Sequence, residues 1–262
     1  MFDALRLLAI VWLGLSIACP VNAADRIKLR IGALDNKADA LVAKGGASQG
    51  GIDLGDLGLD DEHTSVFLDI DWWATDNWRF NVTYSRFNRS GERDVDFDFE
   101  FGDLVVPVQA RVNTELDFDL YVVSAAYALI NNDRGRLEVG AGLHLLDMEI
   151  EIDATTSQGT LLADEVADTL APLPNLTLNG ELNLGERWLL RAKAGWFGFD
   201  YEDYSGDLIS LSGQVEFAFT EHFGAGVGYQ FVDVDVEVDG SRFTEQYNLE
   251  FSGPLVYLMA SF

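Results

Sequence analysis

The chain has little cysteine, little proline and far fewer basic than acidic side chains. It holds one cysteine, Cys19, and 5 prolines among 262 residues. Lys and Arg together number 17 and Asp and Glu 44, which gives a formal charge of −27. Such a charge argues against nucleic acid and anionic membrane surfaces as partners. Attraction of cations would be a functional explanation of the charge; solubility is the simpler one, and we favour it.

Long apolar runs are missing after residue 23, so the sequence predicts no transmembrane helix. Residues 1–23 have the pattern of a cleaved signal peptide: Arg6, a short apolar run from Leu7 to Ala18, and small residues ending at Ala23. A lipoprotein signal would instead use Cys19. Such a signal is expected to have a leucine three positions before the cysteine, and this chain has Ser16 there. We therefore expect cleavage after Ala23 and one domain over residues 24–262. An exported chain of this kind is periplasmic, secreted or a membrane barrel.

Alternating apolar and polar residues predict an all-β protein. Ten segments alternate: 26–34, 64–74, 79–88, 117–129, 136–152, 174–183, 188–200, 207–219, 223–238 and 246–262. Tight turns at 75–77, 131–135, 184–186 and 220–222 alternate with longer links at 35–63, 89–116, 153–173, 201–206 and 239–245. Short turns at one end and longer loops at the other are typical of an antiparallel up-and-down transmembrane β-barrel. We predict ten strands, with eight as the alternative.

The heights of the aromatic residues separate a barrel from a soluble sandwich, which would also alternate. Trp72, Phe80, Tyr127, Trp188, Phe219 and Phe262 stand next to short turns, while Tyr84, Trp196, Tyr229 and Phe231 stand towards the long links. In a tilted strand, Trp188 and Trp196 would be about 20 Å apart along the membrane normal. This is close to the distance between the two aromatic girdles of a membrane barrel. In a soluble protein, nothing would favour aromatic residues at two particular levels along the strands.

The last strand carries the clearest resemblance to a known class. Val256, Leu258, Ala260 and Phe262 share one face, and the strand ends on an aromatic ring. This resembles the closing strand of bacterial outer-membrane β-barrels, and from Ala24 onward the chain is similar to the small OmpW-like and OmpA-like barrel families. The resemblance implies a location in the cell outer membrane, contact with membrane lipid and lipopolysaccharide, and use of the barrel-assembly machinery, with Phe262 as an assembly signal. We expect a monomer.

The inward faces predict two layers in the lumen. The lower layer is a charge plug with five basic and five acidic side chains, formed by Lys28, Arg30, Asp69, Asp71, Arg79, Glu138, Glu181, Arg191, Lys193 and Glu216. Small barrels are filled by their own side chains, so these charges should pair rather than line an ion pathway. Further from the turns the polarity inverts, and apolar residues face inward. The expected lining of this apolar upper lumen is Phe118, Phe197, Phe199, Tyr247 and Phe251.

Where the polarity inverts, carboxylates face outward on several strands. They include Asp147, Glu149, Glu151, Asp153, Asp233, Asp235 and Glu237. No ligand cage is visible in the sequence, so we expect no cofactor and no defined metal site, only weak collective binding of Ca²⁺ or Mg²⁺ at this rim.

Three functions fit these patterns. The first is a structural or surface barrel without catalytic activity, and the second is a narrow conduit for small hydrophobic ligands through the apolar upper lumen. The third is an outer-membrane lipid-modifying enzyme with a His-centred site, for which His144 is the inward candidate. Asp147 falls on the opposite face from His144, and no local partner is evident. We therefore expect no enzyme and no catalytic residues.

Overall fold

The computed structural model describes residues 26–45, 52–59, 62–95, 99–101, 104–106, 110–155, 161–201, 204–239 and 244–262. The expected signal peptide, residues 1–23, lies outside them. No helix in these ranges is long and apolar enough to cross a bilayer.

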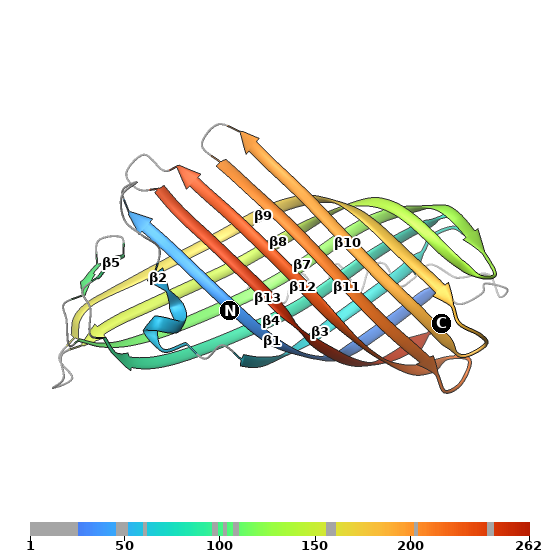
Figure 1. Cartoon of the computed structure of the whole chain (residues 1–262), viewed down its shortest axis with the longest axis horizontal. Helices are drawn as coiled ribbons and strands as arrows, with labels where there is room; N and C mark the ends of the chain where they lie inside the picture. The colour runs from blue at the N-terminus through green and yellow to red at the C-terminus, as the bar shows by residue number, and fades with distance from the viewer. Residues whose placement is uncertain are drawn as a thin grey trace, which may run out of the picture.

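Ten long antiparallel strands close into a barrel (Figure 1). They are β1 (Ile27–Gly45), β3 (Glu62–Trp73), β4 (Trp78–Asp94), β7 (Arg111–Asn132), β8 (Gly135–Thr155), β9 (Leu161–Asn183), β10 (Trp188–Tyr201), β11 (Tyr204–Ala218), β12 (Phe223–Asp239) and β13 (Thr244–Ser261). Each pairs with the next long strand along the chain, and β13 pairs with β1. The predicted ten-strand barrel is confirmed, and the eight-strand alternative is wrong.

The strands extend further than the sequence predicted. β1 continues to Gly45, β9 begins at Leu161, and Tyr201 already pairs with Tyr204 across the expected link at 201–206. The links predicted at 35–63, 89–116, 153–173 and 239–245 are likewise shortened from both sides by strand. The reason is that alternation continues above the apolar belt with the faces exchanged, so the strands extend beyond the segments whose outer face is apolar.

Side-chain oxygens stabilise the tight turns at one end of the barrel. The Thr75 hydroxyl accepts hydrogen bonds from the backbone N–H groups of Asn77 and Trp78, and the Thr220 hydroxyl accepts from those of His222 and Phe223. Between β7 and β8, the side chain of Asn132 accepts from the N–H of Arg134. These bonds favour compact turns, as the sequence predicted at this end, which we call the turn end.

The opposite end, the loop end, holds the smaller elements β2 (Ile52–Asp53), η1 (Leu54–Leu57), β5 (Phe99–Phe101) and β6 (Leu104–Val106). η1 lies near β1, β4 and β7. Leu59 follows η1 and is buried in the apolar core. Gly58 has a φ of 96°, and a Cβ on Gly91 would lie 2.0 Å from the Gly58 carbonyl oxygen. Glycine at both positions therefore lets this segment lie directly against β4.

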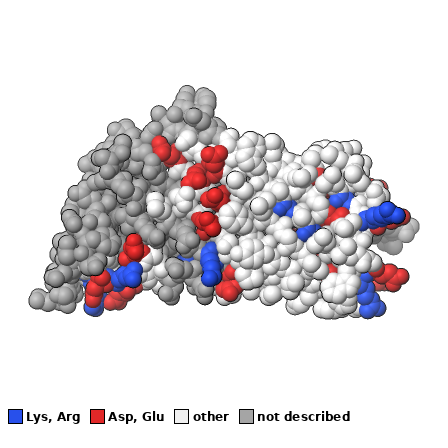
Figure 2. Space-filling view, in the orientation of Figure 1, with Lys and Arg blue, Asp and Glu red and all other residues white. Residues whose placement is uncertain are grey.

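The outer surface has an apolar belt between two rows of aromatic rings. Near the turn end, Trp72 stacks on Phe80 with ring centroids 5.5 Å apart. Towards the loop end, Tyr84 and Tyr121 are 4.9 Å apart, and Trp196 and Tyr229 are exposed. On one face, acidic side chains gather beside the loop end and mixed charges at the turn end, with mostly uncharged surface between them (Figure 2). This is the surface expected of a barrel that spans a membrane.

The barrel closes where β13 meets β1. Their pairing runs from Lys28 opposite Ser261 to Gly45 opposite Thr244. At the turn end, Phe262 N–H donates to Ile27 O at 2.8 Å, and Ile27 N–H donates to Phe262 O at 2.9 Å. The Phe262 side chain is 62% exposed on the outer face. The final residue therefore adds two backbone hydrogen bonds to the seam.

Candidate functional site

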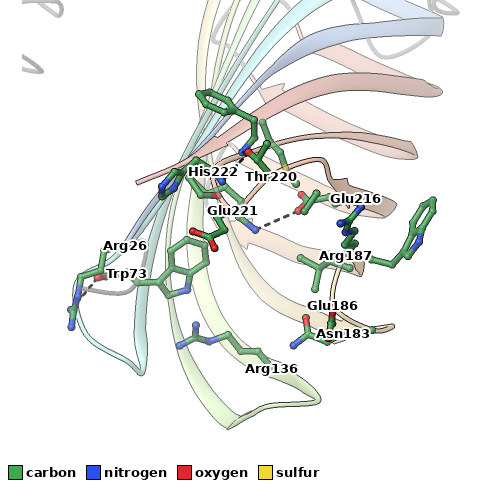
Figure 3. A pocket seen from close by; sticks show the side chains of 18 of the residues that line it. Arg26, Trp73, Arg136, Asn183, Glu186, Arg187, Glu216, Thr220, Glu221 and His222 are labelled. Atoms are coloured by element: carbon green, nitrogen blue, oxygen red, sulfur yellow. Dashed lines mark hydrogen bonds and ion pairs between the residues drawn. The ribbon is translucent and has the colours of Figure 1, made fainter. Parts of the chain in front are cut away.

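The lumen opens at the turn end into a vestibule of about 460 Å³. Side chains of the turns surround it, among them Arg26, Arg187 and His222 (Figure 3). Arg26 donates to the backbone oxygen of Ala74 at 3.0 Å. At its inner end, Lys28 Nζ lies 3.4 Å from Glu216 Oε2. The vestibule therefore leads directly to charged side chains.

Arg30 is the first of three arginines that connect these charges. Its guanidinium lies 2.6 Å from an oxygen of Asp69, 2.7 Å from one of Asp71 and 2.7 Å from one of Glu216. Asp69 and Asp71 are on β3, next to β1, whereas Glu216 is on β11, the third strand from β1 on the other side. Arg30 therefore links parts of the wall that share no backbone ladder.

Arg79 and Arg191 extend these links across the lumen. Arg79 lies 2.5 Å from Glu138 on β8 and 3.5 Å from both Asp71 and Glu181. Arg191 lies 3.1 Å from Asp71 and 3.4 Å from both Glu181 and Glu216. Strands β3 and β4 are thereby joined through side chains to β8, β9, β10 and β11.

All ten charged residues predicted for the lower lumen lie in this one layer, which we call the charge layer. Lys193 completes it, with Nζ 3.3 Å from Asp69. The layer also includes residues outside the predicted ten, among them Asn81, Arg136, Gln214 and Tyr257. Asn81 donates to both Asp69 and Asp71 at 2.9 Å, and Arg136 lies 2.9 Å from Glu138. Inward alternation already places Asn81 and Gln214 on the lumen face, and the same pattern on β8 and β13 could have identified Arg136 and Tyr257.

Above the charge layer lies a cavity of about 140 Å³, which we call the middle cavity. His144, Asn175, Thr177 and Lys193 are among its lining residues. His144 is 6% exposed, and its Nδ1 has no hydrogen-bond partner. The His-centred site that the enzyme alternative requires therefore has no carboxylate bonded to this nitrogen.

The apolar upper lumen is packed with side chains. Phe118 and Phe251 stack with centroids 5.1 Å apart and an interplanar angle of 9°, and Phe87 lies 5.0 Å from Phe118. Phe197 packs against this core. The side chains of Phe199 and Tyr247, expected in the same lining, lie outside the described residues. Phe118 and Phe251 therefore form a ring cluster across the space that an axial conduit would use.

Carboxylates oppose one another on the outer face beside this core. Asp117 pairs with Glu149, Asp119 with Asp147, and Glu115 with Glu151 across the β7–β8 ladder. Asp233 similarly stands opposite Glu250. Burial and then the neighbouring Asp235 raise the pKa of Asp233. Within the described part of the chain, no group of three His, Cys, Asp or Glu is placed to hold a metal ion.

A search of solved structures finds outer-membrane barrels. The outer membrane protease OmpT from Escherichia coli matches with a TM-score of 0.59 at 13% identity, over 91% of this chain and 97% of that chain. The translocator domain of the autotransporter NalP from Neisseria meningitidis matches with a TM-score of 0.44 at 12% identity, over 99% and 95%. The chain has the fold of an outer-membrane β-barrel.

No family model and no curated protein matches the chain. The OmpW-like and OmpA-like families are thus not singled out. At 13% identity, the similarity to OmpT concerns the fold and does not extend to its protease activity.

Proposed function

We propose that the mature chain is a non-catalytic outer-membrane barrel whose lumen is closed to ions. It resides in the membrane through its apolar belt, and its partners are membrane lipid, lipopolysaccharide and, during assembly, the machinery that reads Phe262. Its role is structural or at the cell surface.

The charge layer is the observation that carries this proposal. Arg30, Arg79 and Arg191 each contact acidic residues on more than one strand, and together they cross the lumen. Charge-assisted pairs of this kind are short and strong, so we expect these side chains to stay paired across the lumen and to obstruct an ion path. The stacked rings of Phe87, Phe118 and Phe251 close the lumen a second time nearer the loop end.

Planar-bilayer recording tests the closure. Wild-type protein should give no steady ion current, and the double variant Arg79→Gln with Arg191→Gln should show intermittent conductance because two cross-lumen links are lost. The matched control is Arg26→Gln with Arg187→Gln, which removes two arginines from the vestibule and should stay silent. A steady porin-like current in the wild type, unchanged in the Arg79 and Arg191 variant, would refute the closed lumen.

A His-centred enzyme remains the alternative in principle, but the unpaired Nδ1 of His144 gives it no support. Loss of a lipid modification in His144→Ala cells would favour that alternative over the barrel proposed here.

A further inference from the structure

The wall of the barrel is split between β9 and β10. Their ladder ends at Leu176 opposite Trp196. Above this pair, β9 continues paired with β8 back to Leu161, and β10 continues paired with β11 to Tyr201. Figure 1 shows β10 turning away from β9 and ending at a different part of the loop end. Two strand edges therefore face each other without a ladder.

Two prolines explain where the ladder stops. Leu184 N–H donates to Trp188 O beside β10, whereas Asn183 N–H donates to Arg134 O beside β8. The pairing of β9 is regular from Leu182 back to Pro172. The nitrogen of every even-numbered residue there consequently points towards β10. Pro172 and Pro174 supply the next two such nitrogens and have no hydrogen to donate.

The middle cavity begins directly below the split. Asn175 and Gly195 line it at the height of the last ladder pair. Several atoms of its lining residues have no hydrogen-bond partner, among them His144 Nδ1, Asn175 Oδ1 and Thr177 Oγ1. His144 is 6% and Asn175 4% exposed. A buried polar atom without a partner is costly, so each of these atoms favours a bound polar group.

Glycines create the space for this arrangement. A Cβ on Gly142 would lie 2.5 Å from Asn175 Oδ1, and one on Gly195 would lie 2.7 Å from Asn175 Nδ2. The Asn175 amide therefore lies against the backbones of both β8 and β10. Any larger residue at either position would displace it from the cavity.

Lys193 gives the cavity its charge preference. Among the described residues its ammonium forms an ion pair with Asp69 alone, and its side chain is 26% exposed. The charge layer contains six basic and five acidic side chains when Arg136 is included, so its sum is +1. A second carboxylate at Lys193 would be compatible with this balance.

We propose that the middle cavity binds the head group of a single-chain carboxylate amphiphile, which reaches it from the outer leaflet through the split between β9 and β10. Lys193 attracts the carboxylate, and Thr177 and His144 donate hydrogen bonds to it. The split starts beside Trp196, in the aromatic row where head groups and acyl chains meet. Leu173 and Phe197 present apolar side chains towards the core at its inner edge. The alkyl chain follows these surfaces.

Binding is tested with octanoate, which is soluble enough to titrate without filling the bilayer. The barrel is placed in lipid nanodiscs with labelled histidines, and the imidazole signal of His144 is followed among the three histidines of the chain. A saturable shift with octanoate, weaker with octanol, is expected. No saturable shift, or one of equal strength with octanol that Lys193→Met leaves unchanged, would overturn the proposal.

Thr177→Val removes the unpartnered hydroxyl at constant shape and should weaken octanoate binding by about 2- to 12-fold. The matched control is Thr114→Val. Thr114 is fully buried and its hydroxyl also lacks a partner, but it is not among the residues that line the middle cavity. It should leave binding unchanged. Equal effects of the two variants would mean that general loosening of the barrel explains the loss.

The route is tested by joining the two edges. Continuing the register past Leu176 and Trp196 would bring residue 174 opposite residue 198. Pro174→Cys with Gly198→Cys, linked by a disulfide or a longer bis-maleimide, should slow octanoate binding several-fold without changing its affinity. Reducing the disulfide should restore the rate, and unlinked protein is the control for the maleimide. No other cysteine lies in residues 26–262. Equal rates in the linked and unlinked protein would rule out the lateral route.

Discussion

Asp71 contacts three arginines of the charge layer, Arg30, Arg79 and Arg191, and its loss should destabilise the barrel strongly. It is fully buried. One oxygen accepts from Arg30 at 2.7 Å and Arg191 at 3.1 Å, and the other accepts from Asn81 at 2.9 Å. In Asp71→Asn the side-chain NH₂ must occupy one of these two places, where it faces other donors. The variant therefore removes a charge and creates a clash between donors.

The size of the effect follows from burial. Removing one partner from a buried ion pair costs about 3–5 kcal/mol, since the other charges remain without full compensation. At about 1.36 kcal/mol per factor of ten, this is roughly a 10²- to 10⁴-fold change in the unfolding equilibrium. The double variant Asp71→Asn with Arg191→Gln should lose less than the sum of the two single variants, because acid and base are removed together.

The unfolding free energy can be measured with urea in lipid vesicles, with fluorescence of the belt tryptophans as the signal. Asp76→Asn is the control. Asp76 lies in a turn with its side chain 89% exposed, 3.7 Å from Arg26, and its loss should not measurably shift the transition. If Asp71→Asn unfolds within about 1 kcal/mol of the wild type, well below the range for a buried pair, the charge layer does not hold the strands together.

Three further predictions concern the whole barrel. The mature protein should fractionate with the outer membrane and migrate faster on gels unheated than boiled, whereas recovery as a soluble periplasmic species would contradict the proposed location. Deleting Phe262 removes the two hydrogen bonds that it shares with Ile27 and should reduce the amount of heat-modifiable barrel in the membrane, while Phe262→Tyr should not. Millimolar Ca²⁺ should raise thermal stability more than NaCl at matched ionic strength, and Asp117→Asn with Asp119→Asn should shrink that difference; equal effects of both salts would leave only screening.

The sequence predicted the strand count and the direction in which most side chains point. Both follow from the alternation of apolar and polar residues with a period of two. This alternation can be recognised in a single strand without knowing its neighbours. Leu146 and Met148 are buried and Asp147 is exposed, as their alternation required. The strand ends were wrong because the backbone pairing of β9 with β8 continues past Pro174 and Pro172 back to Leu161.

Contacts across the lumen could not be predicted in the same way. The meeting of Arg30 with Glu216 depends on how far each strand is shifted along its neighbours, summed from β1 through β13 and β12 to β11. That shift is set by the closed barrel as a whole and by no local pattern. The split is different, since Pro172 and Pro174 lie two residues apart in the sequence and could have indicated an unpaired edge.

The position of the middle cavity follows from the inversion of polarity. On β8, the inward face changes from polar to apolar between His144 and Leu146, and the outward face changes from apolar to acidic between Leu145 and Asp147. Below this height the side chains in the lumen form ion pairs with one another, and above it they pack through stacked aromatic rings. His144 and Asn175 stand between the two layers, and His144 Nδ1 and Asn175 Oδ1 are hydrogen-bonded to neither. A ligand with a charged head and an apolar chain matches both layers at once. The ladder between β9 and β10 ends at this same height, which gives such a ligand a route to the position where the barrel's own side chains leave polar atoms unpaired.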